Sequence, residues 1–190
     1  FIIFTAAAAG HFTGGLPWVM LFGGSISLIV LYGVYKGEGY PFYEALAREK
    51  DRPRRTLFII IPLITTAMGG IISNLFFSPV GFIGYIASGW GDAVGEPAGV
   101  AFGKHEYRVP SMAGVKAIRT LEGSLAIFLS SFTGTFLALT IAGYSLSTCL
   151  WIAAVCSLAG TIVEAFSTHG IDNLTVQVAA SGTAFLLLAI

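Results

Sequence analysis

Two carboxylates, Asp92 and Glu96, stand one helical turn apart in a largely apolar stretch, GWGDAVGEPAGVAFGKHEYR (residues 89–108). Residues spaced by four share one face of a helix. An ionised carboxylate at membrane depth costs at least ~2.5–3.5 kcal/mol unless it is paired or hydrated, so the pair indicates a functional site. Carboxylate oxygens beside bare glycine backbone suit a hard cation such as Mg²⁺ that carries nucleotide phosphates. The alternative explanation is an ion pair with Lys104 or Arg108.

Glycine recurs every fourth residue beside these carboxylates, at positions 91, 95, 99 and 103. Such a stripe of small residues is typical of close packing between membrane helices, which is the simpler explanation of the glycines by themselves. Packing does not explain the carboxylates. Because Gly91 and Gly95 lie next to the acidic face, we also expect them to line a nucleotide site.

Two further polar groups lie at the boundaries of later apolar runs. Thr120 and Glu122 open the run KAIRTLEGSLAIF, and the cations that precede them suit phosphate oxygens. Hydroxyl and acidic side chains also favour helix N-termini, so a structural role at the helix start is an open alternative. Glu164 ends one apolar run, and Asp172 and Asn173 begin the next. A boundary position would explain each of these residues separately.

The elements that must position these groups are membrane helices. Of the 190 residues, 55% are hydrophobic and only 11% are charged, and the mean hydropathy is +0.82. Soluble domains carry roughly 25% charged residues, which excludes that class. Apolar runs near 20 residues long match a hydrocarbon core of about 30 Å. We predict an all-α, polytopic bundle of about six to seven transmembrane helices, folded as one domain over residues 1–190.

The predicted spans can be located individually from the apolar runs. They are residues 1–10, 16–36, 56–77, 79–103, 122–143, 146–166 and 172–190. Because the chain opens inside an apolar run without Met, we expect further residues to precede it. Cys149 and Cys156 lie seven residues apart in one predicted helix, about 10 Å, which is beyond disulfide reach, so we expect free thiols.

The basic residues decide the orientation. All ten Lys and Arg residues fall in the links at residues 36–55 and 104–119. Two spans separate these links, so both lie on one face, and the positive-inside rule makes that face cytoplasmic. Two further spans bring residues 167–173 to the same face. This shared location favours a common site for the three polar groups.

The link at residues 39–55 predicts a short amphipathic helix at the membrane interface, ended by Pro53. A topology anchor beside anionic lipid is the explanation that we favour for its basic residues, with phosphate binding as the alternative. The link at residues 104–119 contains Gly103, Pro110 and Gly114 at or near its turns. We expect it to form a mobile flap that orders over a bound triphosphate.

In this order, the motifs resemble those of the CTP-dependent polyprenol kinase family, which includes dolichol, phytol and farnesol kinases and the yeast-type diacylglycerol kinase. The blocks that carry the resemblance span residues 89–178, and Arg119 stands where the family commonly has Lys. The basic N-terminal part of the family pattern is missing. The matching blocks are Gly91-Asp92-Ala93, Gly103-Lys104, Thr120-Leu121-Glu122-Gly123-Ser124 and Asp172-Asn173-Leu174-Thr175.

The resemblance implies transfer of the γ-phosphate of CTP to the hydroxyl of an isoprenoid or lipid alcohol. Asp92 and Glu96 are then the candidate Mg²⁺ ligands, with Glu122 as a third ligand or an orienting group. Asp172 is the candidate general base, and Asn173 would hold substrate or metal. The candidate phosphate and nucleotide contacts are Lys104, Arg108, Lys116, Arg119, Thr120, Gly91 and Gly95.

Two other functions remain open. One is a phosphatidate cytidylyltransferase-type enzyme, in which a lipid phosphate attacks CTP and pyrophosphate leaves. The other is a non-catalytic subunit of a membrane complex that retains the kinase fold. The expected partners are CTP, a lipid alcohol that enters from the bilayer, and the surrounding lipids, without nucleic acid. The identity of the alcohol and the oligomeric state stay open.

Overall fold

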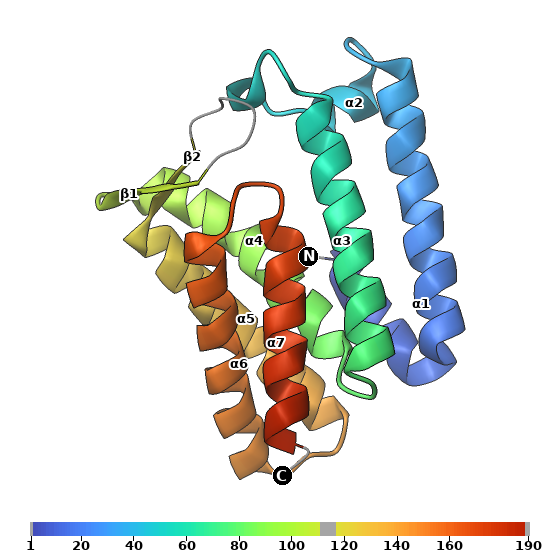
Figure 1. Ribbon diagram of the computed structural model, residues 1–190, viewed down its shortest axis with the longest axis vertical. Coiled ribbons are helices and arrows are strands. Elements are labelled where there is room, and N and C mark those ends of the chain that lie inside the picture. The colour runs from blue at the N-terminus through green and yellow to red at the C-terminus, as the bar shows by residue number, and fades with distance from the viewer. Residues whose placement is uncertain (1, 111–116, 189–190) are drawn as a thin grey trace.

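The computed structural model describes residues 2–110 and 117–188, which form a bundle of long helices with one small β-hairpin. The helices agree with the predicted spans to within a few residues, so the all-α membrane bundle is confirmed (Figure 1). In chain order the elements are α1 (Ile2–Lys36), α2 (Pro41–Leu46), the 3₁₀ turn η1 (Glu49–Asp51), α3 (Leu57–Phe76), α4 (Phe82–Phe102), β1 (Glu106–Val109), β2 (Ala117–Thr120), α5 (Leu121–Ile141), α6 (Leu146–Phe166) and α7 (Asp172–Leu188).

Helix α1 consists of two helical stretches that meet at Gly15, where φ is 63° and ψ is −159°. A positive φ favours glycine because it has no Cβ, and Pro17, which lacks a backbone donor, is accommodated at the start of the second stretch. The chain turns at this point, and the second stretch runs beside α3 (Figure 1). The break coincides with the predicted gap between the first two spans.

Helix α4 lies in the interior, and its first eight residues, 82–89, are all buried. Its glycines let α5 approach closely. A Cβ at Gly91 would lie 2.9 Å from Oγ of Ser131, and a Cβ at Gly95 would collide with Ile127. The glycine stripe is therefore a packing surface, which was the simpler of the two explanations.

Hydrogen bonds inside the bundle hold α7 against its neighbours. Oγ of Ser181 donates to Oγ of Ser73 on α3 at 2.9 Å. Oγ1 of Thr65 donates to the carbonyl of Gly170 at 2.7 Å. The second bond fixes the turn that leads into α7, and with it the position of Asp172.

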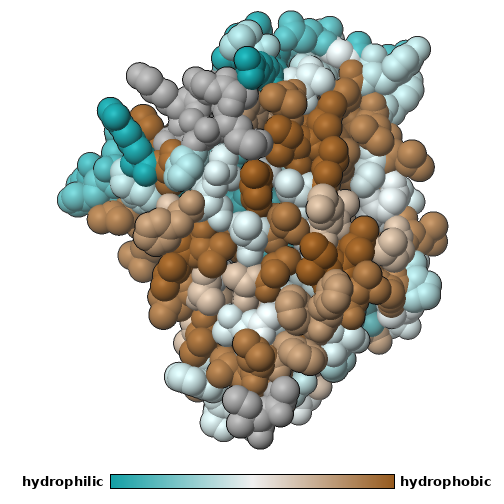
Figure 2. Space-filling view, viewed as in Figure 1, coloured by the Kyte–Doolittle hydropathy of each residue, from teal (hydrophilic) through white to brown (hydrophobic). Residues whose placement is uncertain are grey.

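Four described helices are long and apolar enough to cross a membrane by length and composition: Ile2–Lys36, Leu57–Phe76, Leu121–Ile141 and Leu146–Phe166. Helix α7 has 17 described residues, and α4 carries Asp92 and Glu96. The middle and lower parts of the visible face are largely apolar, whereas hydrophilic residues gather at the end that carries α2 and the hairpin (Figure 2). These are the features of a multi-pass membrane protein.

The three charged links meet at one end of the bundle, as the alternation of spans predicts (Figure 1). The backbone amide of His169, in the α6–α7 link, donates to the carbonyl of Pro110 at 3.4 Å. Nη2 of Arg48, in the link before α3, lies 2.7 Å from Nε2 of the same histidine. Segments more than a hundred residues apart in the chain are thus in direct contact.

Two of these links differ from the prediction. In the link between α4 and α5, β1 and β2 form an antiparallel hairpin in which Tyr107 lies opposite Arg119, and the sequence did not predict these strands. Backbone groups that leave the helices here satisfy one another by pairing. Residues 37–56, which we call the cap, contain two short elements, α2 and η1, instead of one helix that ends at Pro53.

Candidate active site

A cavity of about 910 Å³ opens between the cap, α1, α3, α4, the hairpin and the α6–α7 link. The wall formed by α1 and α3 is mainly apolar and includes Phe4, Ile26, Val30, Phe58, Ile59 and Leu63. The cap, α4, the hairpin and the α6–α7 link contribute the charged side chains. One cavity therefore offers an apolar surface and a cluster of ionised groups.

Arg119 on β2 connects the hairpin to the ends of α6 and α7. Its Nε lies 2.9 Å from Oε1 of Glu164, and its Nη2 lies 2.6 Å from Oδ2 of Asp172. The three side chains are only 13%, 7% and 15% exposed. Nη1 of Arg119 and Oε2 of Glu164 are buried without a hydrogen-bond partner among the described residues. The cluster therefore keeps one unused donor and one unused acceptor.

Arg48 of the cap occupies a second position on the cavity wall. Its Nη1 lies 2.9 Å from Oε2 of Glu96 on α4, and its Nε lies 3.0 Å from Oδ2 of Asp51. Burial alone would lower the pKa of Arg48, but the negative charges of Glu96 and Asp51 and their hydrogen bonds outweigh it and raise the pKa above its ordinary value. Arg48 is therefore a permanent cation of the cavity.

Asp92 faces the cavity from α4, and its side chain is exposed there. It forms no hydrogen bond or ion pair with another described residue. In the described part of the chain, no group of three or more His, Cys, Asp or Glu side chains is placed to hold a metal ion. Mg²⁺ that carries phosphates commonly uses only one or two carboxylates, so Asp92 fits such an ion, and Glu96, which Arg48 binds, lies one helical turn away.

The cavity brings together about half of the residues that the sequence singled out. Beside Asp92 and Glu96, it is lined by Gly95, Arg119, Thr120, Asp172 and Asn173. Oδ1 of Asp172 accepts hydrogen bonds from the backbone amides of Gly170 and Asn173, at 3.1 Å and 3.0 Å. Asp172 therefore both orders the start of α7 and faces the cavity.

Other predicted site residues lie outside the lining of this cavity. Glu122 binds the α4–α5 link: Oε2 accepts from the amide of Lys104 at 3.1 Å, and Oε1 lies 2.6 Å from Nδ1 of His105. The side chains of Lys104 and Arg108 are exposed outside the cavity lining, and Gly91 lies at the α4–α5 contact. Lys116 lies outside the described residues.

The structure also decides two alternatives that the sequence left open, namely an N-cap role for Thr120 and an ion pair for Glu96. Oγ1 of Thr120 accepts from the amide of Gly123 at 3.1 Å, so Thr120 is the N-cap of α5 as well as a cavity residue. An ion pair for Glu96 exists, but its partner is Arg48 rather than Lys104 or Arg108. Cys149 and Cys156 are free and buried, as predicted.

Sequence reasoning missed Asp51 and His169, and it favoured a topology anchor for the link that carries Arg48. Asp51 is 3% exposed, and its Oδ1 has no hydrogen-bond partner among the described residues. Nε2 of His169 lies 3.9 Å from this oxygen. The sequence placed both residues in links on the same membrane face, and this shared location was the only indication that they could belong to the site.

Comparison with known proteins gives one match and two negative results. No family model matches the chain, and no solved structure matches it significantly. Over 118 residues, the chain is 33% identical to a protein of Synechocystis sp. described as a phytol kinase. The match covers 59% of this chain and 48% of the relative, so the chain spans about half the length of the curated relative that it matches. The match to a phytol kinase agrees with the family resemblance that the order of the motifs indicates.

Proposed function

We propose that this chain is a CTP-dependent kinase that transfers the γ-phosphate of CTP to the hydroxyl of a membrane isoprenoid or lipid alcohol. The observation that carries the proposal is the cavity itself. Its charged side holds two arginines and the unpaired Asp92, and its other side is an apolar wall of α1 and α3. Phosphoryl transfer to a lipid alcohol requires charged groups for the phosphates and an apolar surface for the lipid chain in the same cavity.

The roles of the residues follow from what phosphoryl transfer demands. Catalysis of this step consists mainly of positioning and of stabilising the charge on the transferred group. Bound Mg²⁺ would neutralise phosphate charge, with Asp92 and then Glu96 as its protein ligands. Arg119 would contact a phosphate through Nη1, which is buried and unpartnered among the described residues. Asp172 would accept the proton of the alcohol, and Asn173 would hold the substrate.

The apolar wall suits the substrate tail. A lipid alcohol must place its hydroxyl among charged groups while its chain stays in apolar surroundings, because exposing that chain to water costs about 0.8 kcal/mol per CH₂. Phe4, Ile26 and Phe58 are part of this wall. The name of the Synechocystis relative supports a lipid alcohol as the acceptor.

The test is a phosphorylation assay on purified protein in detergent or nanodiscs, with Mg²⁺ and a panel of phytol, farnesol, dolichol and diacylglycerol. CTP is supplied with its radiolabel either on the γ-phosphate or on the α-phosphate. We expect label in the lipid product from γ-labelled CTP only. Replacing CTP by ATP, GTP or UTP tests the choice of nucleotide.

The same assay separates the alternatives. Phosphatidate is added as a further acceptor, and label from α-labelled CTP in its product would identify a cytidylyltransferase and refute the kinase. Absence of turnover with every alcohol and nucleotide, from protein that is folded by its thermal unfolding curve, would favour a non-catalytic subunit. An Asp92→Asn variant serves as the matched negative control.

A further inference from the structure

The arginines of the cap form ion pairs of two kinds. Arg52 pairs with Glu49 and Arg55 pairs with Glu44, so both ion pairs lie within the cap. Arg48 instead reaches across to Glu96 on α4 and lines the cavity. Arg48 thus differs from Arg52 and Arg55 because it binds a residue outside the cap, although it also pairs with Asp51 inside it.

We propose that Arg48 is a phosphate-binding residue of this cavity and that it binds by exchanging Glu96 for a phosphate group. The identity of the nucleotide rests on the proposed function. The cap would then contribute a ligand-binding residue directly to the site. Glu96, one turn from Asp92 on α4, would lose its contact with Arg48 at the same time.

The exchange is favoured because the Arg48–Glu96 pair is the more accessible of the two arginine–carboxylate clusters. Its side chains are 32% and 45% exposed, against 13% and 7% for Arg119 and Glu164. An exposed ion pair contributes little to stability because solvent screens it. A triphosphate carries several negative charges where Glu96 carries one, so it attracts the Nη1 group of Arg48 more strongly.

The remaining partners of Arg48 keep its guanidinium in place during the exchange. Nε stays bound to Oδ2 of Asp51, which is 3% exposed, and Nη2 stays close to Nε2 of His169. Only Nη1 has to change its acceptor. A side chain that is already oriented loses less conformational entropy when it binds a ligand.

Replacing Glu96 by a phosphate on Arg48 would change the balance of charge in the cavity. With Glu96 on Arg48, only the Asp92 carboxylate of the α4 pair is unpaired. Asp92 and Glu96 both line the cavity, so a phosphate that takes the place of Glu96 on Arg48 adds negative charge beside them. A divalent cation that arrives with the nucleotide offsets this repulsion, so phosphate and metal should bind cooperatively.

The experiment measures equilibrium binding to the purified full chain in detergent, with CTP and with inorganic tripolyphosphate, each in Mg²⁺ and in EDTA. The variants are Arg48→Ala, Arg48→Lys and Glu96→Gln. Arg52→Ala is the matched control, because this arginine lies four residues away and pairs with Glu49 outside the cavity lining. Thermal unfolding curves establish that each variant is folded.

We expect Arg48→Ala to weaken tripolyphosphate and CTP binding by about ten- to a hundredfold, the range for a charge-assisted hydrogen bond. Arg48→Lys should recover part of the loss, and Arg52→Ala should bind like the original chain. Glu96→Gln should tighten tripolyphosphate binding in EDTA by several fold, because it removes the competing carboxylate. The same variant should lose most of the gain that Mg²⁺ confers.

A purely structural ion pair would behave differently. Weaker or unchanged tripolyphosphate binding in Glu96→Gln, together with a lowered unfolding temperature, would overturn the exchange. If Arg48→Ala does not fold, Arg48→Lys and Glu96→Gln still decide the matter. Arg48-dependent binding without any phosphorylation of alcohols would sustain this inference while the kinase proposal fails, and an original chain that binds neither ligand would refute both.

Discussion

At the scale of single residues, the two aspartates with proposed catalytic roles differ in what surrounds them. Asp92 forms no hydrogen bond or ion pair with another described residue, although it faces a cavity lined by charged groups. Asp172 is bound by the guanidinium of Arg119 at 2.6 Å and by two backbone amides. An unpaired carboxylate adds little to stability, whereas a carboxylate in a buried network adds more.

Asp92→Asn and Asp172→Asn should therefore separate activity from stability. We expect Asp92→Asn to lower turnover by about a hundredfold or more, with an unfolding temperature within a few degrees of the original. Asp172→Asn should also lower turnover, but with a loss of about 1–3 kcal/mol in the free energy of unfolding because Arg119 loses a charged partner. Radiolabel assays and thermal unfolding of both proteins provide the comparison. Normal turnover in Asp92→Asn would remove this residue from the site.

Arg119 and Arg108 form a second matched pair, since both lie on the hairpin, and the side chain of Arg119 is 13% exposed whereas Arg108 is exposed to solvent. Arg119→Ala should weaken CTP binding by about one to two decades. It should also cost about 3–5 kcal/mol of stability, because it leaves Glu164 buried without its cation. Arg119→Lys should recover much of the CTP affinity, and Arg108→Ala should change neither quantity. Titration of CTP alongside thermal unfolding tests this, and an Arg108→Ala variant that loses CTP would restore the phosphate role first assigned to that residue.

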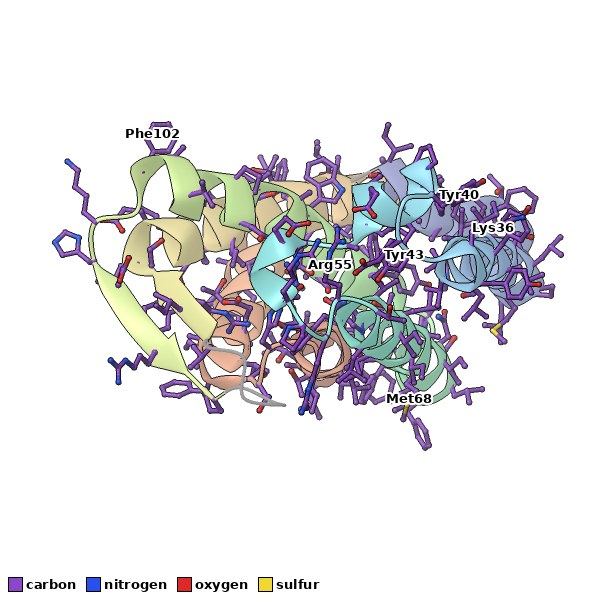
Figure 3. The ribbon with its side chains drawn as sticks, turned by 90° about the horizontal axis from the view of Figure 1, so that it is seen from above. Lys36, Tyr40, Tyr43, Arg55, Met68 and Phe102 are labelled. Carbon is purple, nitrogen blue, oxygen red and sulfur yellow. The ribbon has the colours of Figure 1, made fainter. Side chains whose placement is uncertain are left out.

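At the scale of elements, the cap is held together by one buried cation. Arg55 is 4% exposed, and its Nη2 lies 2.6 Å from Oε2 of Glu44 and 2.9 Å from the carbonyl of Ala47. Its guanidinium stacks over the ring of Tyr43 at 5.6 Å, and Figure 3 shows these two side chains together over the middle of the molecule. Tyr43 in turn packs with Ala47 and Ile59, which joins the cap to α3. This packing determines where Arg48 lies.

The attachment of the cap should depend on pH through Glu44. Hydrogen bonds from Arg55 and from the amide of Gly39 lower the pKa of Glu44 below its ordinary value of 4.5. Because the folded-state pKa is the lower one, the contact stabilises the cap fully above about pH 4.5 and is lost as the pH falls through the lowered value. The original chain should thus be more stable than Glu44→Gln at neutral pH, and the difference should shrink in acid. Thermal unfolding of both proteins from about pH 7 to pH 3 measures it, and a constant difference would contradict the prediction.

At the scale of the whole molecule, the bundle has one charged end and one end without Lys or Arg among its described residues. The cap, the hairpin and the α6–α7 link share the first end, whereas the α5–α6 link and the Gly15 turn lie at the other (Figure 1). The visible face between these ends is largely apolar (Figure 2). By the positive-inside rule, the charged end and the cavity beneath it should face the cytoplasm.

Cysteine labelling tests this orientation directly. The native Cys149 and Cys156 are buried, so they should give a low background. Arg54→Cys and Lys104→Cys, both at exposed positions of the charged end, should react with a membrane-impermeant thiol reagent from the cytoplasmic side only. Ala142→Cys, at an exposed position of the opposite end, should react only from the other side. Labelling of Arg54→Cys and Lys104→Cys from different sides would be incompatible with the cavity.

Hydropathy and the spacing of polar residues were sufficient to determine the helices and the common end of the charged links. They also identified Asp92, Glu96 and Asp172, because an acidic residue inside an apolar run is visible in the sequence itself. Thr120 as a helix N-cap follows from the same local pattern. These features depend on residues close together in the chain, so a linear reading can detect them.

Only the tertiary structure decided which of these groups meet. The contacts of Arg48 with Glu96 and of Arg119 with Glu164 join residues that are 48 and 45 positions apart. Such contacts depend on the rotation of each helix about its axis and on the path of the links, and hydropathy specifies neither. For the same reason, Glu122 could not be distinguished from a cavity residue, and His169 could not be recognised as a neighbour of Asp51. The sequence determined that a polar site exists at one end of a membrane bundle, and the packing of the helices decided which residues form it.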